Sequence, residues 1–181
     1  KGLVDYKKYS GVQLTENGKI EGMKVTRRHR LAERLLTDIL NRDLSKVHEE
    51  ACRLEHSIAD ETADEIARFL ENPDTCPHGH PIPDEEAKVQ EEDLMKLTEG
   101  EEGEEYEVVE IPEREEDIQR LLPLAVLPGS KVKLEDKSSV GAMLVKKGRD
   151  RLALSRDIGS KIMVRPYGRR RRRRRRDRSS G

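Results

Sequence analysis

The sequence predicts a multidomain α+β protein, and three patterns along its 181 residues lead to that fold class. Near the start, two short stretches alternate apolar and polar residues around a Ser-Gly pair, which is typical of a β-hairpin. The middle of the chain repeats its apolar residues at helical spacing. The last third contains five short alternating stretches separated by glycines, which is typical of a small β-barrel.

The hairpin and the start of the following helix are expected in residues 1–22. The alternating apolar residues are Val4, Tyr6, Val12 and Leu14. Thr15 is expected to cap the helix, because a Thr side chain at this position accepts a hydrogen bond from a first-turn N–H group. A hairpin with Lys7 and Lys8 near its tip, next to a helix, resembles the wing of a winged helix-turn-helix domain. Residues 1–22 are therefore interpreted as a winged-helix remnant or as an ordinary hairpin.

Three helices are expected in residues 23–83, where they form an all-α domain. The apolar stripe of the first helix comprises Leu31, Ala32, Leu35, Leu36 and Ile39. That of the second helix comprises Leu44, Val47, Ala51, Leu54 and Ile58. Asp60 is expected to cap a third helix over residues 61–70. This helix should end at Asn72-Pro73, because helical geometry is disfavoured before a proline.

Six residues with metal-ligand side chains lie on the first two helices, beside the apolar stripes: His29, Glu33, His48, Cys52, Glu55 and His56. The first two are four positions apart and share one helix face, and the last three follow i, i+3, i+4 spacing. A lone His or Glu in such a place is usually a hydrogen-bonded or solvated side chain. Six of them within 28 residues favour a metal site. This mixture of thiolate, imidazole and carboxylate suits Fe²⁺, Zn²⁺, Co²⁺ or Ni²⁺.

Composition limits the remaining classes of protein. Charged residues make up 40% of the chain and aromatic residues 3%, so any core is aliphatic and modest in size. No apolar run approaches the roughly 18 residues of a membrane span, so no membrane association is expected. The two cysteines, Cys52 and Cys76, form neither a disulfide framework nor a paired zinc motif. A free Cys52 among charged residues indicates a reducing compartment, and we expect a cytoplasmic protein.

Two charged segments flank or enter the predicted barrel. Residues 84–117 contain seventeen acidic residues against three basic ones, and such blocks of like charge tend to be solvated. We interpret residues 84–104 as an acidic linker with one short helix around Glu85–Leu97. Residues 168–181, with eight consecutive arginines, Arg169–Arg176, are expected to form a disordered tail. The tail either attracts DNA phosphate without sequence preference or has no set role, and the first interpretation is favoured.

The sequence lacks the motifs of the enzymes that use similar residues. His48-Glu49 does not continue to the second histidine of an HExxH zinc motif. No histidine has a glutamate three residues before it, as a di-iron carboxylate bundle requires. There is also no glycine-rich phosphate loop and no GxSxG turn. Neither enzymatic activity nor a small-molecule substrate is expected.

Three segments, RRHRLAERLLTDIL, KVHEEACRLEH and PHGHPIP, resemble the iron-dependent repressors of the diphtheria toxin repressor family. The resemblance extends from the wing through the helices to a C-terminal SH3-like (FeoA-like) domain at residues 105–167. It implies a metal-dependent, DNA-binding transcriptional repressor that controls metal homeostasis. Fe²⁺ would be the corepressor, with Mn²⁺, Co²⁺, Ni²⁺ or Zn²⁺ as substitutes. The resemblance also implies a homodimer, formed through residues 23–83, that binds double-stranded operator DNA.

The same resemblance divides the ligands between two sites. The primary, activating site comprises Cys52, Glu55 and His56, with the backbone carbonyl of Cys52 as a further candidate ligand, and a Met outside this chain completes it. The ancillary site comprises His29, Glu33 and His48. The manganese-sensing branch of the family has an acidic residue where Cys52 stands, so a thiolate here favours iron. Lys7 and Lys8 would contact DNA phosphates, which position a protein on DNA without specifying sequence.

The C-terminal domain is expected to contain five strands and one helix. The strands are expected at residues 106–111, 129–134, 142–145, 151–154 and 161–164, and the helix at 115–122. In the family, a Glu and a Gln three residues later from this domain complete the ancillary site. The segment LLPLAVLPGS aligns Arg114 and Asp117 with those positions. Because Arg114 cannot bind a cation, Glu113 or Glu116 would have to replace it beside Asp117.

The segment CPHGHP offers a further pattern of ligands, with Cys76, His78 and His80 at alternate positions. Its prolines impose an extended turn, and family members carry a similar loop without these ligands. We interpret the segment as a structural loop in preference to a further metal site.

The ligand pattern and the family resemblance together imply a repressor that senses ferrous iron, in which metal binds the operator-competent state more tightly than the inactive one. The alternative is a metal-binding dimerisation module without regulatory output. A helix-turn-helix upstream of Lys1 would separate the two.

Overall fold

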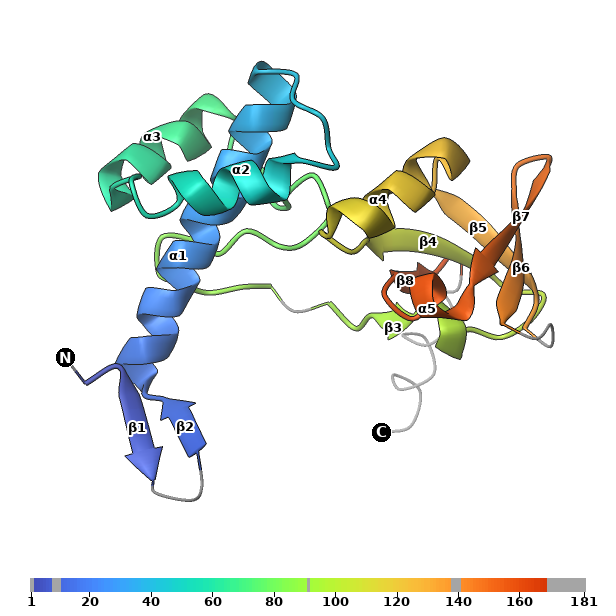
Figure 1. The fold of residues 1–181 in the computed structure, drawn as a ribbon, viewed down its shortest axis with the longest axis horizontal. Coiled ribbons are helices and arrows are strands. Elements are labelled where there is room, and N and C mark those ends of the chain that lie inside the picture. Colours follow the sequence, from blue (N-terminus) through green and yellow to red (C-terminus); the bar gives the residue numbers. More distant parts are fainter. Residues whose placement is uncertain (1, 8–10, 91, 138–140, 169–181) are drawn as a thin grey trace, which may run out of the picture. The chain divides into compact units, whose positions relative to one another are not determined.

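The computed structural model describes residues 2–7, 11–90, 92–137 and 141–168. The chain divides into two compact units, Lys1–Glu91 and Glu92–Gly181 (Figure 1). Helices dominate the first unit, and one antiparallel sheet dominates the second. This mixture confirms the predicted α+β class. Among the described residues, no helix is both long and apolar enough to cross a membrane.

The first unit begins with the predicted hairpin. Strands β1 (Val4–Lys7) and β2 (Gly11–Leu14) are antiparallel, and Val4 pairs with Leu14. Helix α1 (Glu16–Arg34) follows directly, with Thr15 as its N-cap. The Thr15 hydroxyl accepts a hydrogen bond from the Gly18 N–H at 3.0 Å and donates one to the Gly2 carbonyl at 2.7 Å. The cap therefore also ties the chain before β1 to the start of the helix.

Two glycines of α1 differ in their surroundings and provide a test of this packing. A Cβ at Gly18 would lie 2.0 Å from the Leu3 carbonyl oxygen, whereas a Cβ at Gly22 would meet nothing within 4 Å. We expect Gly18→Ala to lower the free energy of unfolding by about 1–3 kcal/mol, because the hairpin must move away. Gly22→Ala should raise it by up to about 1 kcal/mol, because Ala is the better helix former. Urea unfolding followed by circular dichroism measures both, and equal shifts would contradict the close approach at Gly18.

Helix α1 continues into the π-helical turn η1 (Leu35–Ile39), and α2 (Val47–Leu54) and α3 (Asp60–Phe69) complete the helical part. Both later helices lie beside the C-terminal half of α1 (Figure 1). The core between α2 and the continuous helix α1–η1 comprises Ala32, Leu36, Val47 and Ala51. The core between α1 and α3 comprises Leu31, Ala63 and Ala67. Because many of these side chains are alanines, the helix backbones approach closely, which brings the polar edges of α1 and α2 together.

Two details of the helices differ from the prediction. Helix α2 begins at Val47, and Leu44 packs against the core from the preceding turn. Asp60 is the first residue of α3, and the N-cap is Ala59, whose side chain makes no capping hydrogen bond. The expected cap at Asp60 was therefore wrong. The reason is that the Asp60 carboxylate forms an ion pair with Arg28 of α1.

Arginines of α1 hold the surrounding segments in place. The Arg28 Nε donates to the Glu55 carbonyl at 3.0 Å, which satisfies a carbonyl at the end of α2. Arg34 Nε donates to the Thr75 carbonyl at 2.6 Å in the loop after α3. Arg27 forms an ion pair with Asp64 of α3 at 3.0 Å. The positions of α2, α3 and the loop are thus fixed relative to α1.

The second unit is a six-stranded antiparallel sheet with the strand order β3-β8-β4-β5-β6-β7. Its strands are β3 (Met95–Lys96), β4 (Glu105–Glu110), β5 (Lys131–Asp136), β6 (Ala142–Lys147), β7 (Asp150–Ser155) and β8 (Met163–Pro166). Its helical segments are η2 (Leu97–Glu99), α4 (Glu115–Leu121), η3 (Leu122–Leu124) and α5 (Arg156–Gly159). Alternate residues such as Val132 and Leu134 of β5 and Met143 and Val145 of β6 are buried in the core.

The five predicted strands and the helix after the first of them are confirmed, with small shifts of their ends. Strand β3 and helix α5 were missed. The short helix expected around Glu85–Leu97 was wrong, because Met95 pairs with Val164 of β8 and Leu97 is fully buried. The boundary between the two units lies between Glu91 and Glu92, within the expected acidic linker 84–104, and the extent of that linker stays a prediction.

Candidate metal centre

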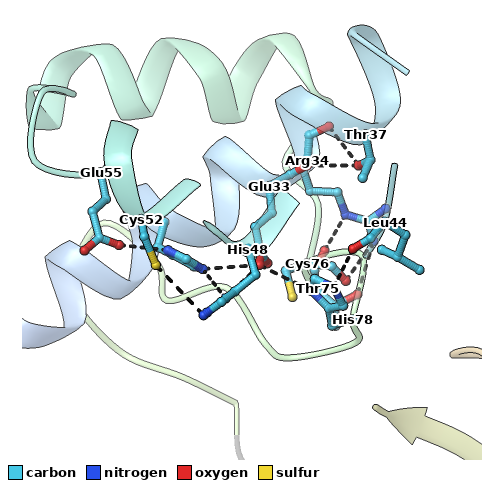
Figure 2. Close-up of polar contacts among 11 residues, drawn as sticks. Glu33, Arg34, Thr37, Leu44, His48, Cys52, Glu55, Thr75, Cys76 and His78 are labelled. Carbon is cyan, nitrogen blue, oxygen red and sulfur yellow. Dashed lines mark hydrogen bonds and ion pairs between the residues drawn. The ribbon is translucent and has the colours of Figure 1, made fainter. Parts of the chain in front are cut away.

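Two helices and one loop of the first unit bring ligand side chains together around Glu33 (Figure 2). Helix α1 supplies His29 and Glu33, one turn apart on its buried face. Helix α2 supplies His48 and Cys52, and Glu55 is its C-cap. The loop that follows α3 supplies Cys76 and His78. The sequence placed His29 and Glu33 at the edge of the apolar stripe, but both are buried, and Glu33 is 0% exposed.

One oxygen of Glu33 faces three imidazole rings. Its Oε1 lies 3.2 Å from His29 Nε2, 3.4 Å from His48 Nδ1 and 3.3 Å from His78 Nδ1. The two ring nitrogens of His29 and His48 are themselves 3.1 Å apart. The other oxygen, Oε2, is buried and has no hydrogen-bond partner among the described residues. A buried carboxylate needs positive charge or hydrogen-bond donors nearby, so this arrangement fits a bound cation.

The electrostatics of the cluster favour an ionised Glu33. Burial opposes ionisation, but the hydrogen bonds with His29 and His78 outweigh it and hold the pKa of the Glu33 carboxyl well below its usual range. Burial lowers the pKa of His29, whereas Glu33 and Glu55 raise it, and the net shift is upward. Protonation of His29, which would place positive charge beside Glu33, is therefore more favourable than in a free imidazole. A divalent cation would supply the same kind of charge to the same carboxylate.

The three residues of the predicted primary site are only partly brought together. Glu55 Oε2 lies 2.8 Å from His29 Nδ1, and Glu55 Oε1 lies 3.2 Å from His56 Nε2. The Cys52 Sγ lies 3.9 Å from Nε2 of His48, which precedes it by one turn on the same helix. Cys52 and His56 are exposed. Glu55 thus contacts both His56, which was predicted for the primary site, and His29, which was predicted for the ancillary site.

Cys76 and His78 reach the same cluster from the loop after α3. They are 1% and 0% exposed, and their ligand atoms and a Glu33 oxygen all lie within 4.8 Å of one another. The sequence analysis favoured a structural loop over a further metal site. The structure places both side chains beside Glu33, and metal binding by this loop stays a prediction. The sequence pattern that offered Cys76 and His78 as candidate ligands was the alternation of Cys and His in CPHGHP. What the sequence did not reveal was that a buried glutamate faces this loop.

The loop that carries Cys76 and His78 is held on several sides. The Cys76 N–H donates to the His80 carbonyl at 2.8 Å, and the Gly79 N–H donates to the Cys76 carbonyl at 2.9 Å. Gly79 has a φ of 94°, which glycine adopts without strain. The His78 Nε2 lies 3.3 Å from the Leu44 carbonyl oxygen. The loop therefore presents its thiol and imidazole from a defined backbone.

The remaining predicted ligands, Glu113, Glu116 and Asp117, belong to the second unit, at the start of α4. Asp117 is buried, and one of its oxygens lies 3.2 Å from Lys161 Nζ. This carboxylate is thus engaged within its own unit. Glu116 is exposed and Glu113 is half-buried. Their participation in a metal site stays a prediction.

The predicted DNA contacts fall largely outside the described part of the chain. Lys8 and Arg169–Arg176 are not among the described residues, and the side chain of Lys7 is not described either. Both interpretations of the arginine tail stay predictions.

Two family profiles match the chain. The profile described as iron dependent repressor, metal binding and dimerisation domain matches residues 15–84, which contain every candidate ligand of the first unit. The FeoA domain profile matches residues 95–166, which correspond to the sheet of the second unit. The two matches follow the division of the structure into two units.

Individual relatives agree with these profiles. The iron-dependent repressor IdeR of Mycobacterium tuberculosis is 32% identical over 167 residues, which cover 84% of this chain and 72% of that protein. The diphtheria toxin repressor of Corynebacterium diphtheriae is 45% identical over 82 residues, which cover 45% of this chain and 36% of that protein. Among solved structures, a manganese-dependent transcriptional repressor in complex with manganese is similar, with a TM-score of 0.85 and 26% identity. That match covers 91% of this chain and 78% of the other.

Proposed function

Because this chain belongs to the family of iron-dependent repressors, we propose that it is a metal-dependent transcriptional repressor with Fe²⁺ as its corepressor. The observation that carries the proposal is the convergence of His29 and His48 on the buried Glu33, beside the Cys52 thiol. Nitrogen, oxygen and sulfur donors in one cluster suit Fe²⁺ and its first-row neighbours. A relative in complex with manganese supports Mn²⁺ as a substitute, and Co²⁺, Ni²⁺ and Zn²⁺ suit the same donors.

Two groups of residues would hold the cations. The primary, activating group is Cys52, Glu55 and His56. The ancillary group is His29, Glu33 and His48, with Glu113, Glu116 and Asp117 as further candidates from the second unit. When bound, the cation supplies positive charge that lets the carboxylates and rings of α1 and α2 converge. The hydrogen bond between His29 and Glu55 joins the two groups.

The regulatory output would be binding of operator DNA. We propose that the β1–β2 hairpin is the wing of a winged helix-turn-helix domain, with Lys7 and Lys8 against DNA phosphates. The pairing of β1 with β2 and the direct start of α1 support this assignment. Repression requires the cation to bind the DNA-competent state more tightly than the inactive state. We also propose a cytoplasmic location, in keeping with the free thiols of Cys52 and Cys76.

The DNA-competent state would be a homodimer formed through the helical domain. Phe69 of α3 is 67% exposed, and Leu54 of α2 is 39% exposed, although both are apolar. Burial against a second copy would remove this apolar surface from water. We expect Phe69→Glu to shift the protein from dimer to monomer in sedimentation velocity. Tyr6→Glu, at a residue of the hairpin that is 70% exposed, is the control and should leave the dimer intact. A dimer that survives Phe69→Glu would place the interface elsewhere.

The identity of the metal can be tested at Cys52. Cys52→Asp should shift activation from Fe²⁺ toward Mn²⁺, because a hard oxygen donor replaces a soft sulfur donor. DNA binding measured at controlled free concentrations of each metal gives the two activation profiles. Glu49→Gln, at an exposed carboxylate of the same helix, is the control and should leave both profiles unchanged. An unchanged preference in Cys52→Asp would count against Cys52 as a ligand.

The alternative function is a metal-binding dimerisation module without regulatory output. It predicts that metal changes the dimer or its stability but never its affinity for DNA. Comparing binding to a promoter-derived duplex with Fe²⁺ and with a chelator separates the two functions.

A further inference from the structure

Basic side chains stand directly opposite one another across three neighbouring strands of the second unit. Lys133 of β5 pairs with Lys146 of β6, and Lys146 pairs in turn with Arg151 of β7. Residues directly opposite in an antiparallel sheet project from the same face, and like charges in such pairs are destabilising. On β5 this is the outer face, because Lys133 lies between the buried Val132 and Leu134. The row therefore lowers the stability of the sheet, and folding alone does not explain it.

The two lysines of this row are not neutralised by an ion pair. Arg151 pairs with Glu135 of β5, with 2.9 Å between Nε and Oε2. In the part of the chain that the structure describes, neither Lys133 nor Lys146 forms such a pair. Glu105 of β4 is opposite Lys133 in the ladder, but the two side chains form no ion pair there. Both ammonium groups therefore remain available to an external anion.

These two lysines line a hollow of about 380 Å³ on the sheet, here named the lysine hollow. Its lining consists of Glu105, Lys131, Val132, Lys133, Lys146 and Gly148. Three lysines against one glutamate make the hollow positive, and Lys131, Lys146 and Gly148 are exposed to solvent. Each ammonium group has three N–H donors and no acceptor, so the hollow suits an anion with several oxygens, such as a phosphate group.

The arginine run of the chain leaves the sheet beside the lysine hollow. The Tyr167 N–H donates a hydrogen bond to the Glu105 carbonyl oxygen at 2.8 Å. The Lys131 Nζ donates to the Tyr167 hydroxyl and lies 4.0 Å from the centroid of its ring. The run Arg169–Arg176 begins two residues after Tyr167. One end of the run is thus tethered to the hollow, and because both are positive they favour a shared polyanion.

The polyanion that fits this surface best is a nucleic-acid duplex. Proteins bind unpaired bases by stacking them on aromatic rings. Among the described residues that line the hollow none is aromatic, and one face of the neighbouring Tyr167 ring is covered by Lys131. Duplex DNA carries one negative charge per about 1.7 Å, whereas an extended peptide of glutamates carries one per about 3.3 Å. The surface thus offers charge to a dense phosphate backbone and no platform for bases.

We propose that the lysine hollow, together with the arginine run, binds the phosphate backbone of duplex DNA without sequence preference and without metal. Phosphate contacts hold a protein on DNA but do not specify a sequence, so the choice of operator stays with the first unit. The contact adds about equally to the affinity for operator and for other DNA. This inference rests on the proposed function, because a repressor is the reason to choose DNA over other duplexes. It adds a second part of the chain that contacts DNA.

Acetylation of lysine side chains, measured by mass spectrometry, tests the contact residue by residue. The experiment uses the full chain at low salt with a chelator and a duplex DNA of scrambled sequence, so metal-dependent operator binding does not contribute. We expect the duplex to slow the acetylation of Lys131, Lys133 and Lys146. Acetylation of Lys96, an exposed lysine of β3 outside the hollow, should be unchanged. High salt should remove the protection, because DNA contacts of this kind depend on counterion release.

A matched pair of double variants tests the effect on affinity. Lys133→Gln with Lys146→Gln should reduce the slope of log affinity against log salt by about 1.8, because each phosphate contact contributes about 0.9. Lys96→Gln with Arg120→Gln removes the same charge from exposed positions of the same unit and should leave the slope unchanged. The first double variant should not unfold at lower urea than the unaltered chain, because it removes a pair of like charges.

The outcomes separate this inference from the proposed function. Acetylation of the three lysines that duplex DNA does not slow, or a slope that falls equally in both double variants, would overturn the inference. Protection by poly-glutamate or by single-stranded RNA at lower concentrations than by duplex DNA would also overturn it. Fe²⁺-dependent binding to a promoter-derived duplex is measured on the same protein. Its absence, with the three lysines still protected by the scrambled duplex, would overturn the proposed function alone.

Discussion

Cys52→Ala is expected to abolish metal-dependent DNA binding while the helical fold survives. The Cys52 side chain is exposed and outside the core of α1 and α2, so its truncation leaves no cavity. It removes the one soft donor of the primary group, and the cation then no longer favours the DNA-competent state. If that state is about 1% populated without metal, the loss of affinity in the presence of Fe²⁺ is about 100-fold.

The measurement is a DNA-binding titration under anaerobic conditions with Fe²⁺ and with a chelator. Glu49→Gln serves as the matched control on α2, since it changes an exposed side chain outside the ligand groups. Circular dichroism of Cys52→Ala should match that of the unaltered protein. Unchanged Fe²⁺-dependent binding by Cys52→Ala would refute the assignment of this residue to the activating site.

Glu33→Gln is expected to have the second large effect, on both metal content and stability. Glu33 is the carboxylate on which His29, His48 and His78 converge, so the change removes the negative charge that would hold a cation there. We expect the ancillary cation to be lost from protein dialysed against micromolar Fe²⁺. The metal-free variant should also unfold about 1–3 kcal/mol more easily, because buried ring nitrogens lose a charged partner.

The stability difference between the metal-free protein and Glu33→Gln should depend on pH. The pKa of Glu33 is lowered from 4.5, so its contribution is present above that value and is lost as pH falls toward the folded pKa. The pKa of His29 is raised from 6.5, so its contribution is present below that value and is lost as pH rises through the folded pKa. The difference should therefore be largest between about pH 4.5 and 6.5. Urea unfolding in the presence of a chelator measures it, and a difference that is flat with pH would contradict an ionised Glu33 paired with His29.

Much of the fold follows from local patterns in the sequence. The hairpin, the Thr15 cap and the five longer strands of the sheet depend on residues close together in the chain, and the structure confirms them. Strand β3 was missed because two residues within an acidic segment carry no periodic signal. Its position depends on β8, almost seventy residues later, and on the burial of Leu97. The cap at Asp60 failed for a similar reason, since Arg28 of α1 binds the carboxylate.

The residue types of the candidate site were predictable from the sequence, but the contacts between its residues were not. Helical spacing identified His29, Glu33 and His48, because residues one turn apart share a face. It did not reveal that Glu33 is fully buried, which depends on the close packing of α1 against α2. Nor did it reveal that Cys76 and His78 reach Glu33, because the path of a loop after a third helix has no periodic signal. The bond between His29 and Glu55 likewise joins groups that the sequence treated as separate.

The account requires that metal controls whether this protein is bound to its DNA sites. The most direct test is genome-wide mapping of the DNA bound by the whole protein in its source organism, in iron-replete cells and in cells treated with an iron chelator. The account predicts discrete sites in promoter regions that are occupied with iron and released by the chelator, and that are not occupied by the Cys52→Ala protein in either condition. Equal occupancy with and without iron, or binding without discrete sites, would contradict it.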